Sequence, residues 1–112
     1  MDPKKAVPAG IHAVELKKVE SKPYKSSNGE NREFLLCHWE VLYGPLKGRP
    51  FTSPLYFHTK KSTEKIEKLI SFMGLPSDTP FDNRLEGGRC LLSVFIDKNG
   101  RNTALPYGRI PA

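Results

Sequence analysis

The segment from residue 35 to residue 49, LLCHWEVLYGPLKGR, constrains the fold more than any other part of the chain. Its first half carries an apolar residue at every second position, as a strand with one buried face does. That face consists of Leu35, Cys37, Trp39 and Val41. Gly44-Pro45 and Gly48 then mark a tight turn into a second strand that opens on cations. We therefore predict an antiparallel hairpin in the core of a small β-barrel.

The remaining sequence predicts further strands and a helix. The predicted strands cover residues 11–22, 32–43, 49–58, 89–97 and 102–107, and the helix covers residues 59–75. In the first strand the apolar pattern shifts by one residue, which predicts a β-bulge within the run Ile11, Ala13, Val14 and Leu16. Asn99-Gly100 predicts a type I′ turn between the last two strands.

The third and fourth strands are assigned one core face each. In the third strand this face holds Phe51, Leu55 and Phe57, and in the fourth it holds Cys90, Leu92, Val94 and Ile96. Pro50 and Pro54 cannot donate ladder hydrogen bonds, so the third strand is expected at an edge or at breaks in pairing. The sequence leaves open whether that strand is a free edge or the seam of a homodimer.

The predicted helix has a start signal, an apolar stripe and a stop signal. Ser62 is the expected N-cap. The stripe recurs at intervals of three and four residues and consists of Ile66, Leu69, Ile70 and Met73. Gly74, followed by Leu75 and Pro76, ends the helix.

The order of these elements indicates the fold class. Three strands, a helix and two further strands predict an all-β protein with one helix, namely a five-stranded oligonucleotide/oligosaccharide-binding (OB) barrel with the helix between strands three and four. A length of 112 residues fits one such domain. We expect a flexible N-terminal arm over residues 1–9 and a single OB-fold domain over residues 10–112.

The net charge and the cysteine content indicate the kind of partner and the cellular compartment. Eighteen Lys and Arg against 12 Asp and Glu give a net charge of +6, which favours an acidic partner such as nucleic acid. Cys37 and Cys90 lie in apolar runs and are expected to be reduced core residues, with a disulfide as the less favoured alternative. No apolar run approaches membrane-spanning length, and residues 1–10 do not resemble a signal peptide. We expect a cytoplasmic protein without a membrane partner.

The sequence does not indicate an enzyme. Cys37 and His38 are adjacent, so in a strand their side chains point to opposite faces and cannot form a nucleophile–base pair. The chain has neither Cys-x-x-Cys nor His-x-x-x-His, so no metal site is expected. Gly44 and Gly48 are not followed by Gly-Lys-Ser/Thr and do not form a phosphate loop. We expect a non-enzymatic protein that needs no cofactor.

Aromatic and cationic residues occur together where an OB fold holds its ligand. That ligand lies across strands two and three and the loops after strands one and four. Single strands are held by aromatic stacking and by cations along the phosphates. The expected stacking residues are Tyr24, Phe34, His38 and Tyr56. The expected phosphate contacts are Lys25, Arg32, Lys47, Arg49, Lys60, Lys61 and Arg101. The prediction is single-stranded DNA binding with little sequence preference.

The chain also resembles a family of small bacteriophage proteins. The resemblance rests on Pro8-Ala9-Gly10-Ile11, on the central run Trp39-Glu40-Val41-Leu42-Tyr43-Gly44-Pro45-Leu46-Lys47-Gly48-Arg49, and on the helix end Phe72-Met73-Gly74-Leu75. The resemblance implies an OB fold and single-stranded-DNA binding in phage replication or recombination, within the host cytoplasm. It also implies phage replication or recombination proteins as partners. Many such binders recruit partners through an acidic tail, whereas no carboxylate side chain follows Asp97 here.

Two alternatives stay open. The same barrel face could grip a peptide of a host or phage replication protein, through the apolar residues Phe34, Leu36 and Leu42. An RNA binder of the cold-shock type is less favoured, because the chain lacks the closely spaced aromatic motifs of those proteins.

Overall fold

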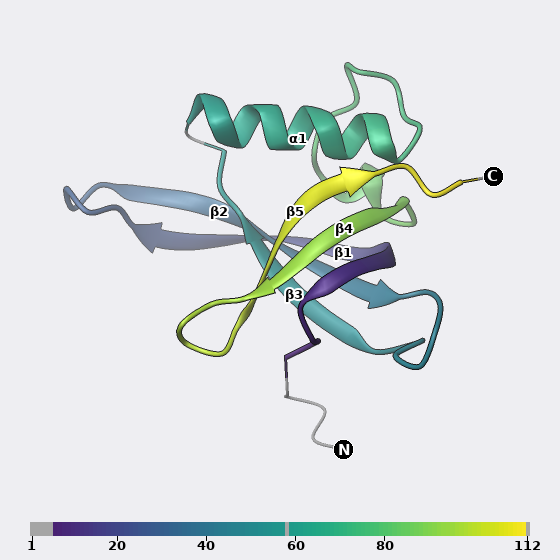
Figure 1. Ribbon diagram of the computed structural model, residues 1–112. Helices are drawn as coiled ribbons and strands as arrows, with labels where there is room; N and C mark the ends of the chain where they lie inside the picture. The colour runs from purple at the N-terminus through teal and green to yellow at the C-terminus, as the bar shows by residue number, and fades with distance from the viewer. Residues whose placement is uncertain (1–5, 58, 112) are drawn as a thin grey trace.

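The computed structural model describes residues 6–57 and 59–111. Its elements are β1 (Gly10–Lys25), β2 (Asn31–Val41), β3 (Pro50–Leu55), α1 (Lys60–Phe72), the short 3₁₀ helix η1 (Asn83–Leu85), β4 (Arg89–Ile96) and β5 (Asn102–Gly108). Within these residues the five strands form one antiparallel sheet in the order β3-β2-β1-β4-β5, and α1 joins β3 to β4 (Figure 1). The predicted mostly-β class and the position of the helix are confirmed. His58 lies outside the described residues.

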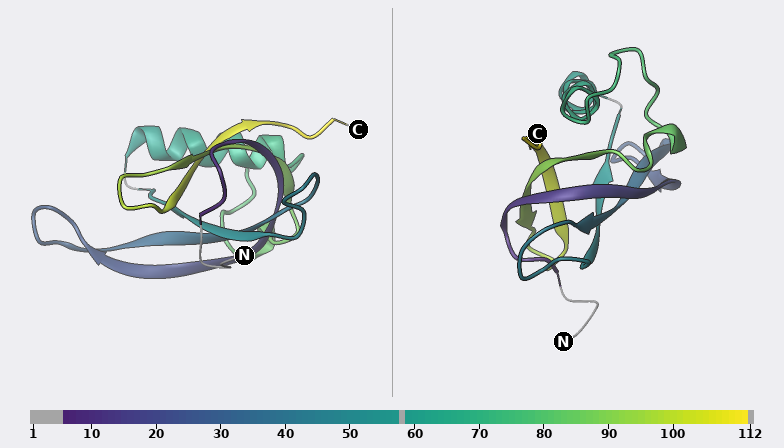
Figure 2. Two further views of the ribbon diagram at one scale, coloured as in Figure 1. Left: turned by 60° about the horizontal axis from the view of Figure 1, so that its bottom comes forward. Right: turned by 90° about the vertical axis from the view of Figure 1, so that its right-hand side faces the viewer.

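β1 is the central strand and contains a bulge. It pairs with β2 from Val14 to Lys25 and with β4 over Gly10–Glu15, and its register with β2 shifts between Leu16 and Lys18. The β1–β2 hairpin therefore extends beyond the rest of the sheet (Figure 2). The predicted bulge exists, but its predicted position within residues 11–16 was wrong. Ile11 is 51% exposed on the outer face, so an alternation counted from Ile11 does not follow the buried face of the strand.

The sheet is not closed into a barrel. β3 and β5 are its edge strands and lie close to each other, but no ladder joins them within the described residues. The Val41 N–H donates to the Arg49 carbonyl, so the even-numbered residues of β3 direct their amide positions away from β2. Two of these three positions are Pro50 and Pro54, which have no N–H. The outer edge of β3 is thus poor in donors, whether for β5 or for a second copy.

The predicted type I′ turn at Asn99-Gly100 was wrong. No described residue other than glycine has a positive φ, which excludes that turn type at Asn99. The Gly100 N–H donates to the Asp97 carbonyl, and Gly100 has φ 76°. This is a type I turn followed by a left-handed glycine. It is stabilised by the Asp97 carboxylate, which accepts from the backbone N–H groups of Asn99 and Arg101.

The helix begins at a different cap from the one predicted. Thr59, not Ser62, is the N-cap, and its hydroxyl accepts from the Ser62 N–H at 3.1 Å. Ser62 lies inside the first turn and is the residue being capped. At the other end, Gly74 has φ 76°, and the Leu75 N–H returns to the Ile70 carbonyl, so the predicted glycine stop is confirmed.

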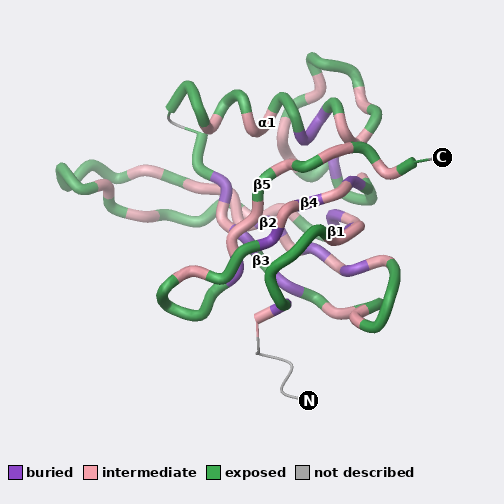
Figure 3. The backbone as a smooth tube through the Cα atoms, in the orientation of Figure 1, coloured by how far each residue is buried: buried purple, intermediate pink, exposed green. Residues whose placement is uncertain are grey.

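The core lies inside the coiled sheet and under the second half of α1 (Figure 3). Trp39 is 2% exposed and its indole N–H donates to the Ser53 hydroxyl at 2.9 Å. Cys37 and Cys90 are buried and free, as predicted. Burial raises the pKa of each thiol to about 12.

Two predicted core residues, Phe57 and Ile96, are not in the core. They are 38% and 46% exposed. Phe57 lies two residues beyond the end of β3, and Ile96 is the last residue of β4, so both lie where the chain leaves the sheet. A period-2 pattern does not report the point at which a strand ends.

The described part of the predicted N-terminal arm is partly packed on the domain. Val7 is fully buried, and the side chain of Asn102, which is also buried, binds both backbone groups of Val7. The Val7 N–H donates to Asn102 Oδ1 and Asn102 Nδ2 donates to the Val7 carbonyl, each at 2.9 Å. Residues 1–5 of the arm lie outside the described residues.

Candidate nucleic-acid interface

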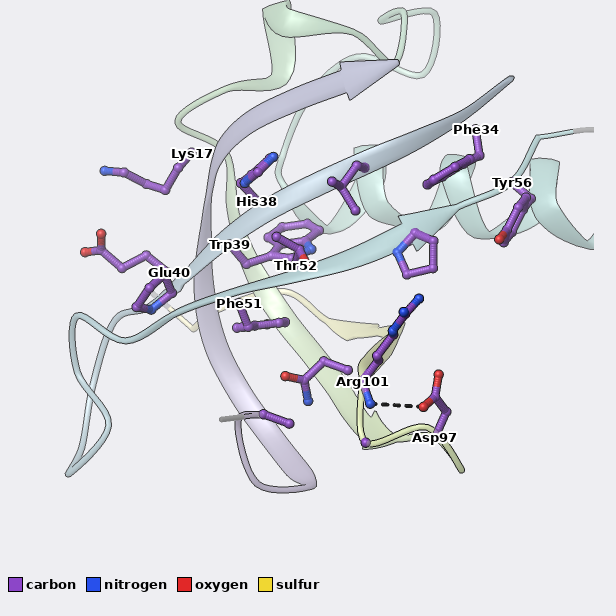
Figure 4. Close-up of a pocket in the computed structure, with 16 residues that line it drawn as sticks. Lys17, Phe34, His38, Trp39, Glu40, Phe51, Thr52, Tyr56, Asp97 and Arg101 are labelled. Carbon is purple, nitrogen blue, oxygen red and sulfur yellow. Dashed lines mark hydrogen bonds between the residues drawn. The ribbon is translucent and has the colours of Figure 1, made fainter. Parts of the chain in front are cut away.

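A groove of about 740 Å³ runs along β2 and β3 and is bounded by the β4–β5 hairpin (Figure 4). Its lining is formed by Ala6, Lys17, Phe34, Leu36, His38, Trp39, Glu40, Pro50, Phe51, Thr52, Pro54, Tyr56, Asp97, Gly100, Arg101 and Asn102. Because His38 is paired with Thr52, and Leu36 with Pro54, the even-numbered residues of both strands share this face. The predicted stacking residues Phe34, His38 and Tyr56 lie on this face.

Three of the predicted stacking residues meet at one end of the groove. The ring centroid of Tyr24 lies 5.8 Å from that of Phe34 and 5.3 Å from that of Tyr56, and both contacts are edge-on. Phe34 and Tyr56 are 5.4 Å apart with ring planes inclined by 33°. Tyr56 is 44% exposed, so this aromatic triad (Tyr24, Phe34 and Tyr56) is open to a ligand. Edge-on packing by Tyr24 holds the other two rings in place.

The fourth predicted stacking residue, His38, also lines the groove but lies apart from the triad. Its Nε2 atom is shielded from solvent and lies 3.5 Å from Glu20 Oε1. That contact lacks hydrogen-bond geometry, so it is an ion pair only when the imidazole is protonated. His38 is therefore oriented toward β1 as much as toward the groove.

Two carboxylates of β1 offset part of the positive charge beside the groove. Glu20 binds Lys18 at 2.7 Å and Lys22 at 3.1 Å, and these contacts, that of Lys18 first, lower the pKa of Glu20 to about 2. Glu15 binds Lys17 and Arg89, each at 2.9 Å, and its pKa is likewise lowered. The prediction of phosphate contacts considered only cations and did not include these acids.

The predicted phosphate contacts are dispersed. Arg32 binds Glu30 at 2.9 Å, and Arg49 donates to the Ala6 carbonyl at 3.4 Å. Four exposed lysines lie outside the groove lining, in the β1–β2 hairpin, the β2–β3 turn and the first turn of α1: Lys25, Lys47, Lys60 and Lys61. Of the predicted cations, Arg101 alone belongs to the lining within the described residues.

Several lining residues were not predicted. Pro50, Thr52 and Pro54 share the face of Tyr56, and the period-2 pattern of β3 could have indicated them. Glu40 could have been found in the same way from His38. Lys17 could not, because it is the extra residue at the bulge and follows no alternation.

No three or more His, Cys, Asp or Glu side chains among residues 6–57 and 59–111 are grouped so that they could hold a metal ion. In the same part of the chain, no helix combines the length and apolar character needed to cross a membrane.

Comparison with protein-family models and with curated proteins gives no match to this chain.

Proposed function

We propose that this protein is an OB-fold protein that binds single-stranded DNA without enzymatic activity and with little sequence preference. The fold assignment is supported by the strand pairing β3-β2-β1-β4-β5 and by the proximity of the two edge strands. Both fit the partly open Greek-key barrel of that fold. The groove on β2, β3 and the β4–β5 hairpin lies where such folds hold oligonucleotides.

The aromatic triad is the observation that carries this proposal. Every nucleobase has an apolar face, so Phe34 and Tyr56 can stack on any sequence. Duplex DNA conceals those faces and is expected to bind much more weakly. The net charge of +6 supplies attraction to the phosphates, which makes the affinity salt-dependent.

The biological setting follows from the resemblance to small phage proteins. We infer that the protein protects or presents single strands during phage replication or recombination, in the cytoplasm of the host. Proteins of those processes are the proposed partners. The resemblance supports this setting through the central run from Trp39 to Arg49.

Fluorescence anisotropy of a labelled oligo-dT strand tests the function directly. A length of about thirty nucleotides exceeds the site size of one OB fold. We expect tight binding to this strand at low salt, a steep loss at higher salt, and little binding to a matched duplex. Tyr56→Ala is expected to weaken binding about tenfold or more, because stacking is worth about 1–3 kcal/mol per base. Tyr43→Ala removes an exposed tyrosine outside the groove lining and is the matched control.

A second candidate is the docking of an extended peptide from a replication protein. It is favoured by the charge balance of the groove lining, where Lys17 and Arg101 are matched by Glu40 and Asp97. The floor is also apolar at Leu36 and at the prolines of β3. Reversing the charges of Lys47 and Arg49 separates the candidates. It should weaken DNA binding strongly, because it lowers the net charge from +6 to +2, and should spare an apolar peptide groove.

A further inference from the structure

Arg101 differs from every other arginine in the described part of the chain. The guanidinium groups of the other five each bind a partner: Arg32 binds Glu30, Arg49 the Ala6 carbonyl, Arg84 Asp82, Arg89 Glu15, and Arg109 the Ser71 carbonyl. Arg101 contacts Asp97 only through its backbone: its N–H donates to Asp97 Oδ1 at 3.0 Å, and its carbonyl accepts from the Asp97 N–H at 2.8 Å. Its guanidinium has no hydrogen bond or ion pair within the described residues.

The nearby Asp97 carboxylate is hydrogen-bonded to the backbone of the turn and not to this guanidinium. Asp97 Oδ1 accepts from the backbone N–H groups of Asn99 and Arg101 and so holds the β4–β5 turn. Figure 4 shows the Arg101 side chain extending away from Asp97 and into the groove, toward the side on which Phe34 and Tyr56 lie. An unpaired, planar cation thus faces an aromatic pair across the groove.

We propose that Arg101 covers a nucleobase held against Phe34 and Tyr56, and that it stacks on the base instead of binding a phosphate. This inference rests on the proposed single-strand binding and assigns one base subsite within it. A guanidinium plane stacks on bases and aromatic rings, which a lysine ammonium does not do. The ring planes of Phe34 and Tyr56 differ by only 33°, so they can present similarly oriented faces to one base.

Arginine-to-lysine replacement distinguishes stacking from phosphate binding. Wild type, Arg101→Ala and Arg101→Lys are titrated against the labelled oligo-dT strand by anisotropy. We expect both variants to bind about tenfold more weakly, with Lys nearly as weak as Ala, because the charge is kept but the plane is lost. Lys68→Ala removes one charge from α1 outside the groove and should leave the affinity unchanged. Circular dichroism confirms that each variant is folded.

A strand of equal length with abasic residues provides an independent test, since it keeps the phosphates and lacks the bases. Wild type and Arg101→Ala should bind this strand equally. With oligo-dT, the slope of log affinity against log salt concentration should be the same for Arg101→Ala as for wild type. Two results would overturn the stacking assignment and leave single-strand binding in place. One is wild-type affinity of Arg101→Lys, and the other is a salt slope of Arg101→Ala that is smaller by about 0.7, as for one lost phosphate contact. If wild type fails to bind oligo-dT, the proposed function fails, and this inference with it.

Discussion

Asn102 is expected to contribute strongly to stability, because it binds both backbone groups of Val7 and holds that residue on the core. We predict that Asn102→Ala lowers the free energy of unfolding by about 2–3 kcal/mol. The variant loses two hydrogen bonds of 2.9 Å to Val7 and one of 3.3 Å to the Phe95 carbonyl. Each is worth about 1 kcal/mol net, and a buried group left unpaired costs a further 1–3 kcal/mol.

Detachment of the N-terminal segment sets the upper limit of this loss. If the segment leaves the sheet, water satisfies the Val7 backbone, and the cost becomes the lost burial of the Val7 side chain. Burying a valine is worth about 1.5–3 kcal/mol. The backbone entropy that each freed residue regains, about 1–2 kcal/mol, offsets the loss of the hydrogen bonds to Asn102. Detachment therefore limits the loss to about the burial energy of Val7, near 2–3 kcal/mol.

Urea denaturation followed by Trp39 fluorescence measures this loss, since Trp39 is the single tryptophan and is 2% exposed. Asn99→Ala, in the exposed turn of the same hairpin, is the matched control and should change stability by less than about 0.5 kcal/mol. Val7→Ala should cost about 2 kcal/mol in the wild type and clearly less in the Asn102→Ala background. Strict additivity of the two changes, or a loss under about 0.5 kcal/mol for Asn102→Ala, would refute the reasoning.

Three further predictions concern buried and paired groups. Because burial raises the pKa of the Cys37 and Cys90 thiols to about 12, a disulfide reagent at pH 8 should react with both only after unfolding, and rapid reaction of the native protein would contradict this. Glu20 has its pKa lowered from 4.5 to about 2 by its lysine neighbours, so its contribution is present above about pH 4.5 and is lost as the pH falls toward 2. Glu20→Gln should therefore flatten the fall in urea midpoint over that window, and equal slopes would exclude the ion pairs as the cause. Ser53→Ala leaves the Trp39 indole N–H unpaired and should cost about 1–3 kcal/mol in urea denaturation, whereas a neutral change would mean that water replaces the hydroxyl.

The parts of the fold that could be predicted are those in which one face of an element decides burial. The alternation from Leu35 to Val41 identified β2 because that strand is buried on one face along its second half. The stripe of α1 identified its packed side for the same reason. By contrast, the ends of β3 and β4 depend on where the chain turns away from the sheet. No local pattern records that point, so Phe57 and Ile96 were misplaced.

The closure of the sheet could not be settled from the strand order alone. Pro50 and Pro54 indicated an edge strand, which is correct for β3. Whether an edge strand meets β5 through a ladder depends on which amide positions point outward. That choice is set by the pairing of Val41 with Arg49, which only the structure provides.

The charge distribution beside the groove depends on the position of a single bulge, and for that reason it could not be predicted from the sequence. With a regular register, residues 17, 19 and 21 of β1 would share the face of His38. The shift between Leu16 and Lys18 instead places Lys18, Glu20 and Lys22 there, opposite His38, Leu36 and Phe34. Glu20 then pairs with its two lysine neighbours on the β1 side of the groove and offsets one of their two charges. The guanidinium of Arg101 stands beside β3 and has no such acidic partner within the described residues. A bound strand is accordingly expected to place a base between Arg101 and the aromatic triad.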